Sequence, residues 1–274
     1  MRKGNERLAD TGAYERIHLF SDKKFTSWWI FGYTRKPMGE VNAGTSGWAY
    51  ASWKPRFYPA TLGSSQFLNY YATRLNSVEV NYTFRSIPTE EQLRSWIAAT
   101  PPHFRFAVKA HQEITHFKRL RGAARTTSEF FSSLRPFQRA RRLGPVLFQL
   151  PPNFKCNAAL LKDFLVELPK DQRIAFEFRH PSWFCDEVYA SLQNSNVALC
   201  HAESEMLETP QIQTAGFFYL RLRKDHYSKK SRQLLAKTII GHARKGDVFV
   251  YFKHEDTPKG ALYADELLAA THAI

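Results

Sequence analysis

The chain has 274 residues, of which 43% are hydrophobic, 15% aromatic and 23% charged. This composition excludes a disordered or collagen-like protein, and the length accommodates either one large α/β barrel or two smaller domains. Lysine and arginine outnumber aspartate and glutamate by 39 − 25 = 14, which favours anionic partners: nucleotides, phosphates, carboxylates or nucleic acid.

The first 37 residues differ from the rest of the chain. Residues 1–37 carry eight Lys/Arg and four Asp/Glu residues, show no sustained hydrophobic period and end at Lys36-Pro37. We favour the interpretation that this segment is a dispensable extension and that the domain occupies residues 38–274. Two alternatives stay open: the natural chain begins at Met38, or a helix near Ala13–Phe20 covers the bottom of the domain.

From residue 40 onward, short β-rich runs alternate with helical patterns. Each run is rich in Val, Ile, Phe, Tyr or Leu, as β-strands require. The predicted strands are Val41–Thr45, Ser77–Asn81, Arg105–Lys109, Val146–Leu150, Ile174–Phe178, Val197–His201, Phe217–Leu222 and Val248–Lys253.

Helical patterns separate these runs. Apolar residues at positions 67, 68, 71, 72 and 75 have helical spacing, and Thr89 with Gln92 three residues later is typical of a capping box. The predicted helices are Ser65–Leu75, one that begins after Thr89, Ser128–Leu143, Ala158–Leu168, Pro181–Leu192, Ser228–Ala243 and Ala261–Ala270. The stretch from His201 through Pro210 is short enough to hold only a turn of helix.

Eight strands that alternate with helices predict a single-domain α/β fold, the (β/α)8 TIM barrel. An open doubly wound sheet is the competing fold, but it usually has fewer strands and a glycine-rich phosphate loop. Gly44-Thr45-Ser46-Gly47 has neither the dinucleotide-binding nor the P-loop spacing, so the barrel is favoured. We expect no cofactor.

Polar residues stand at the predicted strand ends, which is where barrel enzymes carry their chemistry. Alternation along each strand directs toward the axis Glu79, Asn81, Lys109, Gln149, Glu177, Arg179, His201, Tyr219, Arg221, Tyr251 and Lys253. Two glutamates face four cations in this set, which leaves a charge of 4 − 2 = +2 and predicts a site for an anion. An internal salt-bridge network that only closes the barrel top is the alternative.

The candidate catalytic residues are Glu79, Lys109 and Glu177, with a glutamate as general acid or base and the lysine as electrophile or proton donor. The candidate substrate-binding residues are Trp48, Tyr50, Asn81, His111, Gln149, Arg179, His180, His201, Arg221 and Lys253. Basic loops after the third and seventh strands would strengthen the field that attracts an anion. In the aromatic first loop we predict core positions for Trp53 and Phe57 and leave Trp48 and Tyr50 open.

Three cysteines, Cys156, Cys185 and Cys200, have no metal-ligand spacing, and we expect reduced thiols and no metal ion. No apolar run approaches the ~20 residues that span a bilayer. Acidic residues at positions 6, 10 and 15 interrupt any signal-peptide-like segment. The sequence therefore predicts a cytoplasmic protein with no membrane partner, and it does not predict the oligomeric state.

Six motifs, in order, resemble those of the YecE-like family, the domain of unknown function 72. They are Gly44-Thr45-Ser46-Gly47-Trp48, Phe57-Tyr58-Pro59, Val78-Glu79-Val80-Asn81, Val108-Lys109 followed by Ile114-Thr115-His116, the run from Gly144 to Pro152, and the run from Glu177 to Trp183. The resemblance extends from about residue 40 to the end. It implies a TIM barrel similar to sugar isomerases and apurinic endonucleases, and it implies no established reaction.

The C-terminal part departs from the usual pattern of that family. The arginine of the seventh strand is often followed there by a His-Gly pair, where this chain has Arg221-Leu222-Arg223-Lys224. Asparagines often follow the eighth strand, where this chain has Lys253-His254-Glu255-Asp256. Because lysine and glutamate cannot replace the paired donor and acceptor of an amide, we expect different substrate contacts at that end.

Three functions compete at this point. The first is a metal-independent enzyme for a phosphorylated or carboxylated compound, in which a desolvated Lys109 can also form a Schiff base. The second is nucleic-acid binding or cleavage, which the charge of +14 and the implied fold suggest. The third is a barrel that binds a ligand without catalysis.

Overall fold

The computed structural model describes residues 38–203, 207–253 and 256–272, and these form one α/β domain. The predicted extension, residues 1–37, and the alternative helix near Ala13–Phe20 lie outside the described residues.

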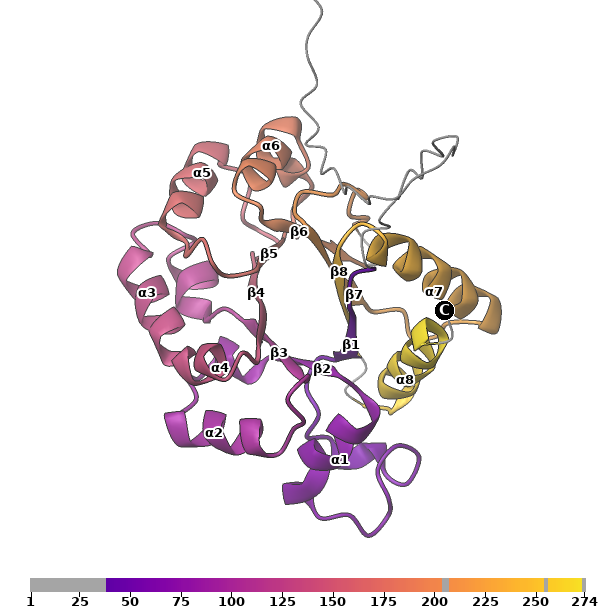
Figure 1. Ribbon diagram of the computed structural model, residues 1–274. Helices are drawn as coiled ribbons and strands as arrows, with labels where there is room; N and C mark the ends of the chain where they lie inside the picture. The colour runs from indigo at the N-terminus through magenta and orange to yellow at the C-terminus, as the bar shows by residue number, and fades with distance from the viewer. Residues whose placement is uncertain (1–37, 204–206, 254–255, 273–274) are drawn as a thin grey trace, which may run out of the picture. The chain divides into compact units, whose positions relative to one another are not determined.

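Eight parallel strands of the described chain form a barrel (Figure 1). Their order is β1-β8-β7-β6-β5-β4-β3-β2, and a bridge between Ser46 and Glu79 joins the ends of β1 and β2. The predicted strands are confirmed, with ends displaced by no more than three residues. The bounds are β1 Val41–Thr45, β2 Ser77–Val80, β3 Arg105–Lys109, β4 Leu143–Gln149, β5 Ile174–Glu177, β6 Ala198–Ala202, β7 Phe217–Leu222 and β8 Asp247–Phe252.

Helices surround the strands on the outside of the barrel (Figure 1). The predicted capping box is present: Gln92 donates its backbone N–H to Thr89 Oγ1 at 3.2 Å, and Thr89 donates its own to Gln92 Oε1 at 2.9 Å. The bounds are α1 Phe67–Arg74, α2 Glu90–Ala98, α3 Ala124–Ser133, α4 Arg135–Arg139, α5 Ala158–Glu167, α6 Asp186–Asn194, α7 Lys229–Ala243 and α8 Lys259–His272.

Two predicted helices have the wrong bounds, because each is interrupted in the structure. The segment predicted as Ser128–Leu143 is divided into α3 and α4, because Pro136 has no N–H and fits only the first turn of a helix; Leu143 already belongs to β4. The segment predicted as Pro181–Leu192 begins with a 3-10 turn, η5 (Pro181–Trp183), and α6 follows only after the extended Cys185. A π-helical turn, η4 (Glu113–Phe117), follows β3 and was not predicted.

The barrel wall separates two apolar clusters. The larger lies between the strands and the helices, and Trp53, Phe57 and Tyr58 of the first loop are buried in it, as predicted for the first two. The smaller fills the lower interior of the barrel with side chains of alternating strand positions, among them Ala107, Leu147, Ala175, Cys200, Tyr219 and Tyr251. Apolar packing therefore supports the charged residues at the carboxyl ends of the strands.

Gly44 determines how closely the two ends of the sheet approach. A Cβ at this position would lie 1.9 Å from the carbonyl oxygen of Ser77 and 2.7 Å from the hydroxyl of Tyr71. The Tyr71 hydroxyl in turn accepts the N–H of Thr45 at 2.9 Å and donates to the Ser77 carbonyl at 2.9 Å. The contact between β1 and β2 therefore requires glycine.

Candidate functional site

Arg221 connects the two predicted carboxylates inside the barrel mouth. Its Nη2 lies 2.7 Å from Oε1 of Glu79, which comes from β2, and its Nη1 lies 2.6 Å from Oε2 of Glu177, at the end of β5. All three side chains are at most 3% exposed. The predicted inward orientation of these residues is confirmed, since strands far apart in sequence bring them together at one end of the barrel.

Every oxygen of the Glu79 carboxylate has a donor. Ser46 donates to Oε1 at 2.7 Å, and the Tyr219 hydroxyl donates to Oε2 at 2.7 Å. Burial by itself raises the pKa of this carboxyl group, but the charge and hydrogen bonds of Arg221 outweigh burial and hold the pKa below its usual range. Glu79 is therefore an ionised, enclosed acceptor.

Glu177 accepts hydrogen bonds from more side chains than Glu79 does. Gln149 donates to Oε2 at 2.9 Å, while Arg179 Nε and Arg223 Nη2 share Oε1 at 3.1 and 2.8 Å. Burial opposes ionisation here as well, and the positive charges of Arg221, Arg223 and Arg179 reverse its effect, so the pKa of Glu177 lies well below its ordinary value. This carboxylate fixes three guanidinium groups in place.

Lys109 differs from these paired groups. Its ammonium nitrogen lies 3.9 Å from the ring centroid of Phe84, and it makes no ion pair with any described residue. Burial first, and then the positive charge of Arg221, lower the pKa of Lys109 to about 8. The amine therefore changes protonation state much closer to neutral pH than an ordinary lysine does.

A cavity of about 710 Å3 opens above these groups, and we call it the mouth cavity. Seven predicted site residues line it: Tyr50, Asn81, Lys109, Gln149, Arg179, Arg221 and Lys253. Tyr82, Phe84, Arg85, Ser86 and Arg223 complete the lining. Asn81 Oδ1 is buried there without a hydrogen-bond partner among the described residues, which leaves one acceptor for a ligand.

A second cavity of about 490 Å3 adjoins the first. It lies among the loops that follow β4, β5 and β6, and its lining includes Pro152, Phe178, His180, Ala202, Leu207 and Thr209. His180 was predicted to bind substrate and reaches this cavity rather than the mouth cavity, while its Nδ1 lies 2.8 Å from Ser182 Oγ. Arg179 and Arg223 line both cavities.

Three predicted site residues lie outside the lining of both cavities: Trp48, His111 and His201. Trp48 packs edge-on against Trp96 of α2, with ring centroids 5.2 Å apart. His111 accepts the backbone N–H of Glu113 at 3.2 Å and stays outside the lining of both cavities.

The inward orientation predicted for His201 is wrong. The inner positions of β6 are held by Ala198, Cys200 and Ala202, which are small enough to leave room for Tyr219 and Arg221 of β7. His201 points outward instead, where its Nε2 lies 3.2 Å from the Ile212 carbonyl and its ring lies 6.2 Å from that of His242.

Sequence reasoning missed several residues of the mouth. Arg223 belongs to the basic loop that we predicted after the seventh strand and was not among the inward residues, although it stands two positions after Arg221 and so keeps the same inward parity. Ser46 had no signal of its own, because it reaches Glu79 only where the barrel closes. Tyr82 and Phe84 follow β2 in a short 3-10 turn, η3 (Tyr82–Phe84), whose course the sequence did not indicate.

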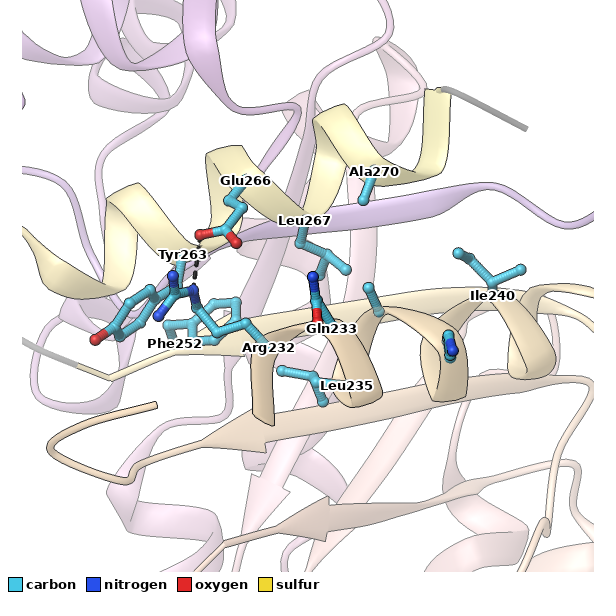
Figure 2. Close-up of a pocket in the computed structure, with 11 residues that line it drawn as sticks. Arg232, Gln233, Leu235, Ile240, Phe252, Tyr263, Glu266, Leu267 and Ala270 are labelled. Atoms are coloured by element: carbon cyan, nitrogen blue, oxygen red, sulfur yellow. Dashed lines mark hydrogen bonds and ion pairs between the residues drawn. The ribbon is translucent and has the colours of Figure 1, made fainter. Parts of the chain in front are cut away.

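A separate cleft of about 400 Å3 lies between α7 and α8 on the outside of the barrel. Arg232 Nε lies 2.7 Å from Glu266 Oε2. Figure 2 shows this pair in the cleft, together with Leu235, Ile240 and Leu267 among the apolar residues that line it. Glu266 neutralises Arg232, and Lys237 is the other charged residue of the lining, so the cleft offers fewer cations for an anion than the mouth does.

No group of three or more His, Cys, Asp or Glu side chains within the described ranges has an arrangement that would hold a metal ion. The described helices include none that is long and apolar enough to cross a membrane. Cys156, Cys185 and Cys200 are free thiols.

Comparison with known proteins identifies the family. The family model "Protein of unknown function DUF72" matches residues 42–273, so the chain belongs to this family and the resemblance seen in the sequence is confirmed. The crystal structure of a DUF72 protein from Thermotoga maritima has a TM-score of 0.75 and 26% identity, over 85% of this chain and 99% of the other. One from Enterococcus faecalis has a TM-score of 0.66 over 84% and 98%, and at 20% identity it supports the fold alone.

A curated relative, the UPF0759 protein YunF of Bacillus subtilis, is 32% identical over 156 residues. The alignment covers 54% of each protein, so the chain spans about half the length of this relative. Family membership establishes the barrel and assigns no reaction, and the function has to be argued from the site.

Proposed function

We propose that this DUF72 barrel is a metal-independent enzyme that acts on a phosphorylated or carboxylated substrate in the mouth cavity. The observation that carries the proposal is the charge of the mouth. Lys109, Arg179, Arg221 and Arg223 lie around the carboxylates of Glu79 and Glu177, and these six groups leave 4 − 2 = +2 in a largely buried site. Arg85 and Lys253 also line the cavity and are not part of this count. A buried excess of positive charge is costly unless an anion neutralises it.

The roles that we propose for the glutamates differ from those expected from the sequence, where a glutamate was the general acid or base. Glu79 and Glu177 are saturated with donors and held ionised, so they are positioning residues that orient guanidinium groups. Arg179 has no described partner for its terminal nitrogens and serves as the clamp for the anion. Lys109, with a pKa of about 8, supplies or removes the proton.

Binding is tested first with inorganic phosphate and with glucose 6-phosphate, by calorimetric titration. Charge-assisted hydrogen bonds contribute about 1.5–3 kcal/mol each, so Arg179→Gln is expected to weaken binding roughly 10- to 100-fold. Arg94→Gln is the matched control, because Arg94 is 71% exposed on α2. If the wild-type protein, Arg179→Gln and Arg94→Gln bind these ligands equally tightly, the mouth is not the anion site.

Catalysis is tested by a screen for turnover of phosphorylated and carboxylated metabolites, with Lys109→Met run in parallel. The reaction should be lost in Lys109→Met while phosphate binding persists, since the clamp is intact in this variant. Turnover that survives the substitution would show that Lys109 is not the reacting group.

Nucleic-acid binding is the second candidate, and the charge of +14 is the observation that favours it. A gel-shift titration across salt distinguishes the two, because binding driven by phosphates weakens steeply with salt. If Arg179→Gln leaves the gel shift unchanged and inorganic phosphate does not compete, nucleic acid binds outside the mouth.

A further inference from the structure

Arg179 and Arg223 stand between two cavities. Both side chains line the mouth cavity, of about 710 Å3, and also the second cavity, of about 490 Å3. Each volume is within the range of small-molecule sites, roughly 300–1,000 Å3. The two arginines therefore form a shared wall with ligand-sized space on either side.

This wall is held in place but not neutralised. Both guanidinium groups donate to one atom, Oε1 of Glu177, at 3.1 and 2.8 Å. The terminal nitrogens of Arg179 have no hydrogen-bond partner among the described residues, and Arg223 Nε is buried without one. Two cations that share one carboxylate oxygen retain donors for a further anion located at the wall.

The two cavities suit different uncharged groups. Tyr82 and Phe84 give the mouth cavity aromatic side chains on which a flat group can stack. The second cavity presents Phe178 and Leu207, with Thr209 as a polar neighbour. An anion at the wall thus has a place for one substituent on each side.

We propose that the two cavities form one site for a small phosphodiester, with its phosphate between Arg179 and Arg223 and one ester substituent in each cavity. The proposal rests on the proposed anion site and narrows its substrate class. A carboxylate and a phosphomonoester each carry only one substituent, so either anion at the wall would fill only one of the two cavities. A diester is the common anion that carries a group on both sides and still presents two oxygens to two guanidinium groups.

The test compares 4-nitrophenyl phosphate with bis(4-nitrophenyl) phosphate by calorimetric titration at pH 8. The monoester carries nearly twice the negative charge of the diester, so charge alone makes the monoester bind more tightly. Use of the second cavity reverses this order, because the additional ring is removed from water, and we expect the diester to bind about tenfold more tightly. A diester that binds no better than the monoester overturns the proposal.

Leu207→Trp tests the position of the second substituent. Leu207 lines the second cavity and not the mouth cavity, and a tryptophan there occupies the space of the second cavity. The diester should lose its tenfold advantage, with the affinity for the monoester unchanged. Leu235→Trp, the same change in the cleft between α7 and α8, is the control and should alter neither affinity. If Leu207→Trp does not fold, Leu207→Ala makes the same test, because it removes the apolar contact with the second ring.

The outcomes separate this inference from the proposed function. Binding of the monoester that Arg179→Gln weakens, without any advantage for the diester, preserves the anion site and overturns the two-cavity site. If neither ester nor inorganic phosphate binds, both the proposed anion site and the two-cavity site are overturned. Equal loss of affinity for both esters in Leu207→Trp contradicts the assignment of one substituent to each cavity.

Discussion

The amine of Lys109 is expected to lose its proton far below the pH at which an ordinary lysine does. Burial beside the Phe84 ring and the charge of Arg221 lower its pKa to about 8. At pH 7 such an amine is neutral in roughly one molecule in ten, against about four in ten thousand for a lysine with the usual pKa near 10.4. Its reactive fraction is therefore larger by roughly two orders of magnitude.

Competitive labelling with acetic anhydride measures this difference. Peptide mass spectrometry gives the rate of acetylation at each lysine from pH 6 to pH 11, with Lys162, exposed on α5, as the internal reference. The profile of Lys109 should have its midpoint near 8. Arg179→Gln removes one of the positive charges that lower the pKa, so the midpoint should move upward in this variant.

The same shift affects stability, and its sign follows from proton linkage. Between about pH 8 and pH 10.4 the unfolded chain keeps a proton that the folded chain has released, so the contribution of Lys109 to the free energy of unfolding increases with pH. Lys109→Met should lack this increase in urea titrations across that range. A labelling midpoint near 10 in the wild-type protein would refute the claim that the mouth desolvates this amine.

Three further changes test the architecture. Tyr219→Phe leaves a buried carboxylate oxygen without its donor and should lower the free energy of unfolding by about 1–3 kcal/mol, whereas Tyr82→Phe, at a half-exposed ring, should change it little. Gly44→Ala should prevent closure of the barrel and abolish cooperative melting, while Gly241→Ala, where a Cβ meets nothing, should stabilise α7 by roughly 0.5–1 kcal/mol. Removal of residues 1–37 should leave the melting temperature of the barrel unchanged, and an insoluble product would contradict the assignment of an extension.

The strands could be predicted from the sequence because each depends on local composition and on alternation along itself. That alternation also placed Glu79, Glu177 and Arg221 on one side of the wall, and the structure joins them. His201 shows the limit of the method: its orientation depends on the space that Tyr219 and Arg221 require inside the barrel, and one strand alone does not contain this information. Alternation along a strand shows which residues share a face, but it does not show by itself which of the two faces points toward the barrel axis.

Non-local geometry explains what the sequence did not indicate. Ser46 and Glu79 are 33 positions apart and meet only because β1 and β2 close the ring. The second cavity lies among loops that have no periodic pattern, so neither its volume nor its shared wall with the mouth could be predicted.

The mouth is organised by burial of charge rather than by apolar packing. A buried ion pair gains little net stability, because desolvation offsets the attraction between its charges. Here the two carboxylates are fully used in orienting arginines, and they leave the cationic excess directed at the cavities. Donors that are fixed before a ligand arrives need no reorganisation when charge develops on it, which is the condition for electrostatic catalysis. In the function that we propose, these fixed donors form the anion site, and the nearby amine of Lys109 is the group that reacts there.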